Sequence, residues 1–95
     1  MNIQIDEAAA SWYIQELGLK KGDCLRFFVR YGGVNGLQAG LSLGVQAEEP
    51  EKDDISIESE GVCFFVSKED VWYFDGHDLH IVIDRKLNEP AFEYK

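Results

Sequence analysis

The sequence is short of several kinds of residue, and each shortage excludes a class of protein. Among its 95 residues are only two cysteines, Cys24 and Cys63, which are too few for a disulfide scaffold or a four-thiolate metal site within one chain. The 9 basic residues against 18 acidic ones give a net charge of −9, which disfavours nucleic acid and anionic membranes as partners. The chain also lacks the roughly 20-residue apolar run of a membrane-spanning helix and the basic start of a signal peptide. We therefore expect a cytoplasmic protein with neither a membrane nor a nucleic-acid partner.

Apolar residues make up 45% of the chain, enough for one small core, so we expect a single domain over residues 1–95. A buried stripe at helical spacing predicts an N-terminal helix from Glu7 to Leu17. Asp6 is expected to accept hydrogen bonds from the first free amides of this helix, and Gly18 to end it. A second, short helix is predicted after Ser67, whose pairing with Asp70 resembles a capping box.

Alternation of apolar and polar residues predicts several strands, of which the clearest runs from Leu37 to Ala47. Its second face carries small residues, which face either solvent or another backbone. The glycine-rich residues 32–36 are expected to form a tight hairpin turn before this strand. Connections in the middle of the chain are short, so antiparallel pairing is expected there. The other strands are predicted at Ile3–Ile5, Cys24–Tyr31, Ile55 with Ile57, Val62–Val66, Leu79–Ile83, and Phe92 with Tyr94 after Pro90. The whole pattern predicts an α+β fold.

Six short motifs follow one another at a characteristic order and spacing. They are Leu25–Val29, Gly33–Gly36, Glu49–Ile55, Glu60–Val62, Phe74–Gly76 and Leu87–Glu89. From Ile3 to Tyr94 the chain resembles the HesB-like family, the A-type iron–sulphur carriers. The resemblance implies a β-rich domain with an N-terminal helix and a second short helix, and an association with iron–sulphur cluster biogenesis.

In that family, function depends on three cysteines, one in the glycine-rich connection and two in a Cys-Gly-Cys ending, because iron prefers soft thiolate ligands. The equivalent connection here is Gly33, Val34, Asn35 and Gly36, so valine stands where the family has cysteine. The sequence ends at Lys95 without the second motif. We therefore expect that an iron–sulphur cluster is not bound, and the sequence names no other cofactor.

Two groups of residues are alternative metal ligands. Asp75, His77, Asp78 and His80 combine imidazole with carboxylate groups, both of which bind divalent metals, although this spacing is also that of an ordinary solvated turn. Cys24 and Cys63 are candidate surrogate thiolates, although a thiol in an apolar strand usually serves as a small buried side chain.

The leading hypothesis is therefore a non-catalytic accessory protein, related to iron–sulphur biogenesis, that has lost the cysteine site. The sequence contains no catalytic motif, and its runs of acidic residues are typical of solvated surface. Two other hypotheses are a metal-binding protein that uses His77 and His80, and an interaction module that pairs with a protein partner or with a second copy of itself.

Overall fold

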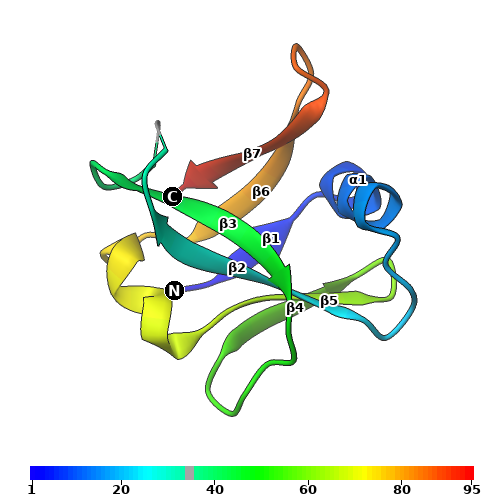
Figure 1. The fold of residues 1–95 in the computed structure, drawn as a ribbon, viewed down its shortest axis with the longest axis horizontal. Coiled ribbons are helices and arrows are strands. Elements are labelled where there is room, and N and C mark those ends of the chain that lie inside the picture. Colours follow the sequence, from blue (N-terminus) through cyan, green and yellow to red (C-terminus); the bar gives the residue numbers. More distant parts are fainter. Residues whose placement is uncertain (34–35) are drawn as a thin grey trace.

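Two β-sheets and an α-helix enclose the core of the protein (Figure 1). The computed structural model describes residues 1–33 and 36–95. The elements in chain order are β1 (Ile3–Ile5), α1 (Glu7–Leu17), β2 (Cys24–Tyr31), β3 (Leu41–Ala47), β4 (Ile55–Ser59), β5 (Val62–Val66), the 3-10 helix η1 (Lys68–Phe74), β6 (Leu79–Asp84) and β7 (Glu89–Tyr94). This arrangement confirms the predicted α+β class, with its N-terminal helix and a second short helix. Neither helix has the length and apolar character needed to span a bilayer, within the residues described.

The larger sheet has the strand order β3-β2-β5-β4, and the smaller one has the order β1-β6-β7. Adjacent strands pair antiparallel in β2–β3, β4–β5 and β6–β7, whereas β2–β5 and β1–β6 are parallel. The expectation of antiparallel pairing in the middle of the chain was therefore wrong for β2 and β5. Between them, β3 and β4 and the segment that joins these strands together form a crossover long enough to bring β5 back parallel to β2.

Helix α1 spans the predicted residues, but its N-terminus is held differently from the prediction. Gly18 adopts the left-handed conformation with φ of 64° and ends the helix, as expected. Asp6 has the extended backbone of an N-cap residue, yet its carboxylate makes no capping hydrogen bond. Instead, Asp6 Oδ1 lies 2.8 Å from His80 Nε2 on β6. His80 on β6 has therefore taken the place of the backbone amides of α1 as the partner of the Asp6 carboxylate.

The connection between β2 and β3 is longer than predicted, because β3 begins at Leu41 and not at Leu37. Two residues before Leu41 make polar contacts with η1. The Leu37 amide donates to Tyr73 Oη at 2.7 Å, and Gln38 Nε2 donates to the Tyr73 carbonyl at 2.8 Å. These bonds replace those of a strand ladder. The predicted tight hairpin of residues 32–36 is thus part of a connection that runs from residue 32 to residue 40.

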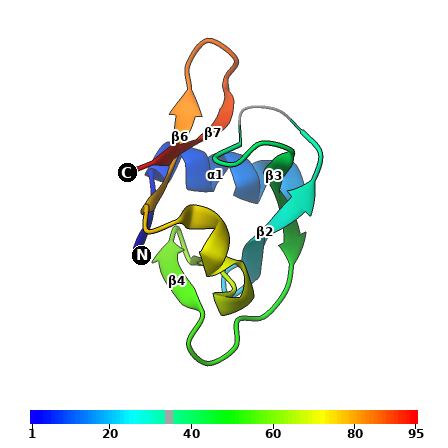
Figure 2. The ribbon, with the colours of Figure 1, turned by 90° about the vertical axis from the view of Figure 1, so that its left-hand side faces the viewer.

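Helix η1 begins at the predicted place, but only half of the predicted capping pair is formed. Ser67 Oγ accepts a hydrogen bond from the Glu69 amide at 3.2 Å. Asp70 instead pairs with Arg26 Nη2 on β2 at 2.9 Å, so it fastens η1 to the larger sheet. Figure 1 shows η1 and α1 on opposite sides of the molecule, and in Figure 2 η1 faces the viewer. The last strand also differs slightly from the prediction, since β7 includes Pro90.

A group of aromatic rings joins both sheets to the helix. Phe27 on β2 is fully buried and lies at its centre. Its ring centroid is 5.5 Å from that of Tyr13 on α1, 6.2 Å from that of Phe64 on β5 and 5.8 Å from that of Phe92 on β7. Phe27 therefore contacts three elements that the sequence separates widely.

Removal of this ring tests its role. Phe27→Ala is expected to lower the free energy of unfolding by about 3–5 kcal/mol, because it leaves a cavity between the layers. Phe27→Leu keeps most of the apolar volume and should cost about 1.5 kcal/mol or less. Tyr31→Ala, at a side chain 93% exposed on the same strand, should change stability by about 0.5 kcal/mol or less. Urea unfolding followed by circular dichroism measures all three, and equal losses at positions 27 and 31 would contradict this account of the core.

Candidate functional site

The glycine-rich connection and the last strand meet at a small hollow of about 230 Å³. Its lining residues are Arg30, Gly33, Gly36, Ser42, Leu43, Phe92 and Tyr94. The connection in which the family resemblance places its first cysteine thus lies beside the last strand. Of the predicted residues of this connection, Val34 and Asn35 lie outside the described part of the chain.

The residues that line this hollow do not fit an iron–sulphur cluster. They offer a guanidinium group, a hydroxyl and a phenol, and none of them carries a thiol. Arg30 Nε donates to Ser42 Oγ at 3.2 Å, which holds beside the connection a positively charged group that has no lone pair to offer a metal. Iron in such clusters takes soft, negatively charged sulphur ligands.

Gly36 fixes the position of the connection next to η1. A Cβ atom at this residue would overlap with the Leu41 carbonyl group and the Tyr73 hydroxyl group. Glycine is therefore required here by close approach of the backbone to its neighbours. With the two bonds from Leu37 and Gln38 to Tyr73, this packing holds the connection without any metal.

The two cysteines are neighbours, but they lie far from the connection. Cys24 at the start of β2 pairs in register with Cys63 on β5. The connection follows the other end of β2, roughly 23 Å away at the rise of a strand. Neither cysteine therefore substitutes for the cysteine that the family carries in the connection.

The environment of Cys24 keeps its thiol protonated. Burial, the Glu49 carboxylate, whose Oε2 is 3.4 Å from Sγ, and the Cys63 thiol together raise the pKa of Cys24 to about 12. A thiol must lose its proton to act as a nucleophile or a metal ligand. The surroundings of Cys24 thus oppose the role of surrogate ligand.

The four residues of the predicted imidazole–carboxylate group have separate structural roles. Asp75 ends η1 in the left-handed conformation, with φ of 48°. Asp78 ties down both ends of the chain, since its carboxylate accepts from the Asn2 amide at 2.7 Å and its carbonyl from the Lys95 amide at 2.9 Å. His80 pairs with Asp6, while the His77 amide donates to the Phe74 carbonyl at 2.8 Å.

These roles leave no metal centre in the part of the chain that the structure describes. Across residues 1–33 and 36–95, no three histidine, cysteine, aspartate or glutamate side chains converge in a way that could hold an ion. The geometry therefore gives no support to the hypothesis of a site at His77 and His80.

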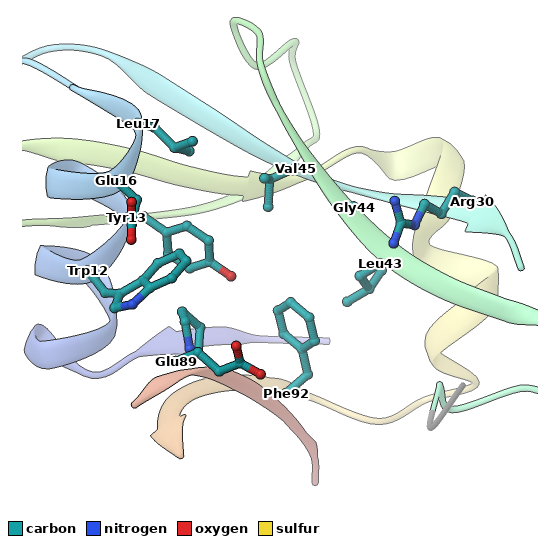
Figure 3. Close-up of a pocket in the computed structure, with 11 residues that line it drawn as sticks. Trp12, Tyr13, Glu16, Leu17, Arg30, Leu43, Gly44, Val45, Glu89 and Phe92 are labelled. Atoms are coloured by element: carbon teal, nitrogen blue, oxygen red, sulfur yellow. The ribbon is translucent and has the colours of Figure 1, made fainter. Parts of the chain in front are cut away.

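A larger groove, of about 640 Å³, lies between α1, β3 and β7 (Figure 3). Figure 3 shows Trp12 and Tyr13 along one wall, Leu43 and Val45 along another, and Glu89 with Phe92 on the third. The other lining residues are Glu16, Leu17, Arg30, Gly44 and Pro90. The groove combines aromatic and aliphatic surface with a few charged groups, as binding sites commonly do.

Sequence reasoning missed this groove because its walls come from three segments that are distant along the chain. The small residues of β3 gave two alternatives for what the second face of this strand contacts: solvent, or the backbone of another segment. The space beside Gly44 is instead occupied by side chains of β2, since a Cβ atom there would meet the Phe28 ring at 2.8 Å and Arg30 Cδ at 3.3 Å.

Comparison with known proteins identifies the class of this chain. Residues 1–92 match the family described as iron-sulphur cluster biosynthesis. The chain belongs to this family, as the HesB-like resemblance predicted. A protein of Bacillus subtilis (strain 168) named pyruvate dehydrogenase inhibitor is 46% identical over 95 residues, which cover 100% of both chains. An uncharacterized protein of Staphylococcus saprophyticus is 35% identical over 98 residues, again covering 100% of both.

Two solved structures share the fold. IscA with its 2Fe–2S cluster superposes with a TM-score of 0.56 at 20% identity, covering 98% of this chain and 83% of that one. Escherichia coli SufA, involved in biosynthesis of iron-sulphur clusters, has a TM-score of 0.56 at 24% identity, covering 99% and 79%. At these identities the likeness concerns the fold alone.

The protonated state of Cys24 is testable by alkylation. At pH 8 Cys24 should react with iodoacetamide at least about 100-fold more slowly than a free cysteine, and its rate should rise with pH to beyond pH 11. Glu49→Gln removes the carboxylate and should speed the reaction, whereas Glu51→Gln should not. Peptide mass spectrometry separates Cys24 from Cys63, and a rate at pH 8 equal to that of free cysteine would contradict the raised pKa.

The misfit of an iron–sulphur cluster is testable by reconstitution. After anaerobic incubation with iron and sulphide, followed by desalting, the chain should retain far less than one cluster per protein and show no strong visible absorption. IscA treated in parallel is the positive control. The expectation fails if the chain retains one cluster per protein and loses it in Cys24→Ser or Cys63→Ser.

Proposed function

We propose that this chain is a non-catalytic regulator that acts by binding another protein, and that its target is pyruvate dehydrogenase, whose activity it lowers. It retains the HesB-like fold of the iron–sulphur biogenesis family but uses that fold for protein recognition. The proposal places the chain in the cytoplasm, in agreement with the sequence expectation.

The observation that carries this proposal is the 46% identity, over the full length of both chains, to the protein named pyruvate dehydrogenase inhibitor. Two features of the site agree with it. The hollow at the glycine-rich connection contains Arg30 in place of soft ligands, and the two cysteines lie at the opposite end of β2. Both features favour a function that needs no cluster.

The titratable groups with clear pKa shifts also favour a binding role over catalysis. Burial raises the pKa values of Tyr13 and Tyr94 above their usual range, and burial with Glu49 raises that of Cys24. Burial opposes the ionisation of Asp54, but hydrogen bonds from the backbone amides of Glu51 and Lys68 keep its pKa below the usual value. Burial opposes the charge of Arg26, but its pairing with Asp70 and Glu48 raises its pKa. All five pKa values move away from neutrality, whereas a general acid or base works best near pH 7.

The proposal is tested with purified pyruvate dehydrogenase complex from the organism that supplies the chain. Addition of the chain should lower the rate of NADH formation to a plateau, with half of the maximal effect near the Kd that calorimetry gives for the same pair. Because binding does not use thiols or metal, the Cys24→Ser, Cys63→Ser double variant should inhibit equally, with or without EDTA.

Two results would contradict the proposal. One is the absence of both binding and inhibition at concentrations well above those of the enzyme. The other is inhibition that disappears in the cysteine-free variant or in EDTA, because that result would show chemistry by sulphur or metal.

A further inference from the structure

The four edge strands of the two sheets differ in how well they are protected against pairing with another chain. In the described residues, β1 has only three residues, β4 carries Glu58, and β7 carries Glu89, Pro90 and Glu93. Short length, charge and proline are the usual means of protecting an edge. In contrast, β3 is seven residues long, Leu41–Ala47, and contains neither a charged residue nor proline.

The free edge of β3 presents the backbone groups of alternate residues. The Gly32 amide donates to the Gly40 carbonyl at 2.8 Å, and the Glu48 amide donates to the Cys24 carbonyl at 3.4 Å. These two bonds show which residues of the antiparallel ladder exchange hydrogen bonds. The even-numbered residues of β3 direct their N–H and C=O groups toward β2. The N–H and C=O groups of Leu43 and Val45 therefore point away from β2.

The side chains of these same two residues line the groove. Leu43 and Val45 face Trp12 and Tyr13 of α1 and Phe92 of β7 across it (Figure 3). A strand added to β3 would direct every second side chain into the groove, because side chains alternate along a strand. The edge and the groove thus form one continuous surface.

The charges along the groove define the chemistry of its occupant. Glu16 and Glu89 lie toward the end formed by α1, and Arg30 lies at the other end (Figure 3). The Arg30 guanidinium donates to the Ser42 hydroxyl and makes no ion pair within the described residues. A second copy of β3 carries no charge, so it would bring no ion-pair partner for Glu16 and Glu89 at one end of the groove or for Arg30 at the other.

We propose that the free edge of β3 and the adjoining groove bind an extended segment of a partner protein, with a basic residue facing Glu16 and Glu89, aliphatic residues in the middle and an acidic residue facing Arg30. This inference rests on the proposed function, since it specifies the surface and the chemistry by which a protein target is recognised. Main-chain hydrogen bonds to Leu43 and Val45 provide the pairing, and the groove selects the side chains.

The test uses a capped synthetic peptide, Lys-Thr-Val-Thr-Val-Thr-Glu, and its reverse, so that both strand directions are sampled. One of them should bind saturably, with amide shifts centred on Leu43 and Val45 and a change in Trp12 emission in a Trp72→Phe background. The same peptide with N-methyl groups on the five backbone nitrogens between lysine and glutamate retains the charges and the side chains but loses every N–H group that can pair with β3 in either strand direction. It should bind at least about tenfold more weakly.

Protein variants separate the edge from general charge effects. Val45→Lys places a cation in the groove and should weaken binding at least about tenfold, whereas Gln46→Lys places the same charge on the opposite face and should change it by less than about twofold. The double variant Glu16→Gln, Glu89→Gln, at exposed positions, should weaken binding of the charged peptide about fivefold. It should not weaken binding of the uncharged peptide Gln-Thr-Val-Thr-Val-Thr-Gln. Removal of two distant charges, Glu51→Gln and Glu60→Gln, is the matched control.

Three outcomes would overturn the inference. They are no binding of either peptide, equal binding to Val45→Lys and Gln46→Lys, and a concentration-dependent dimer that Val45→Lys abolishes, which would make a second copy the occupant. Failure of the proposed function is distinguishable. Peptide binding without any effect on pyruvate dehydrogenase would support the groove as a binding site and contradict the proposed target. Inhibition that persists in Val45→Lys would support the target and contradict the groove as the surface that binds it.

Discussion

The packing of Phe27 against rings from three other elements is the constraint on which the rest of the structure depends. Its contacts with Tyr13, Phe64 and Phe92 set the position of α1 and of β7 relative to the larger sheet. Edge-to-face contacts fix orientation as well as distance, so the layers meet at one arrangement. Because β3 pairs with β2 over its full length, the same packing also determines the width of the groove between β3, α1 and β7.

The fold of the iron–sulphur biogenesis family persists here without the chemistry that its cysteines supply. The connection at the family site is held by Tyr73 on η1, by the close approach at Gly36, and by the pairing of Gly32 with Gly40. These are packing and backbone hydrogen bonds, and none of them uses sulphur. A scaffold supported in this way tolerates loss of the ligands, and its surface is then available for recognition of other molecules.

Much of the fold was predictable, because local patterns determine local elements. The helical stripe and Gly18 located α1 correctly, alternation located β2 and β4, and a short apolar run located β5. Predictions were wrong where a distant group competes with a local one. His80 takes the carboxylate of Asp6, and Tyr73 binds the residues that precede Leu41. Neither partner can be identified from spacing along the chain.

For the candidate sites too, the sequence predicts what depends on neighbouring residues and misses what depends on distant ones. The family resemblance identified Gly33 and Gly36 as part of the connection in which the family has a cysteine, and the structure places both residues beside the last strand. Asp75, Asp78 and His80 were grouped because they are close in sequence, yet Asp75 ends η1, Asp78 binds the two chain ends and His80 pairs with Asp6. The groove was missed for the converse reason. Trp12, Val45 and Phe92 have nothing in common until the sheets are assembled.

The pairing of Cys24 with Cys63 has a consequence for the redox behaviour of the protein. Disulfide formation and reaction with peroxide both begin with a thiolate, and Glu49 and burial withhold that form at Cys24. Oxidation that begins at Cys24 is therefore slow.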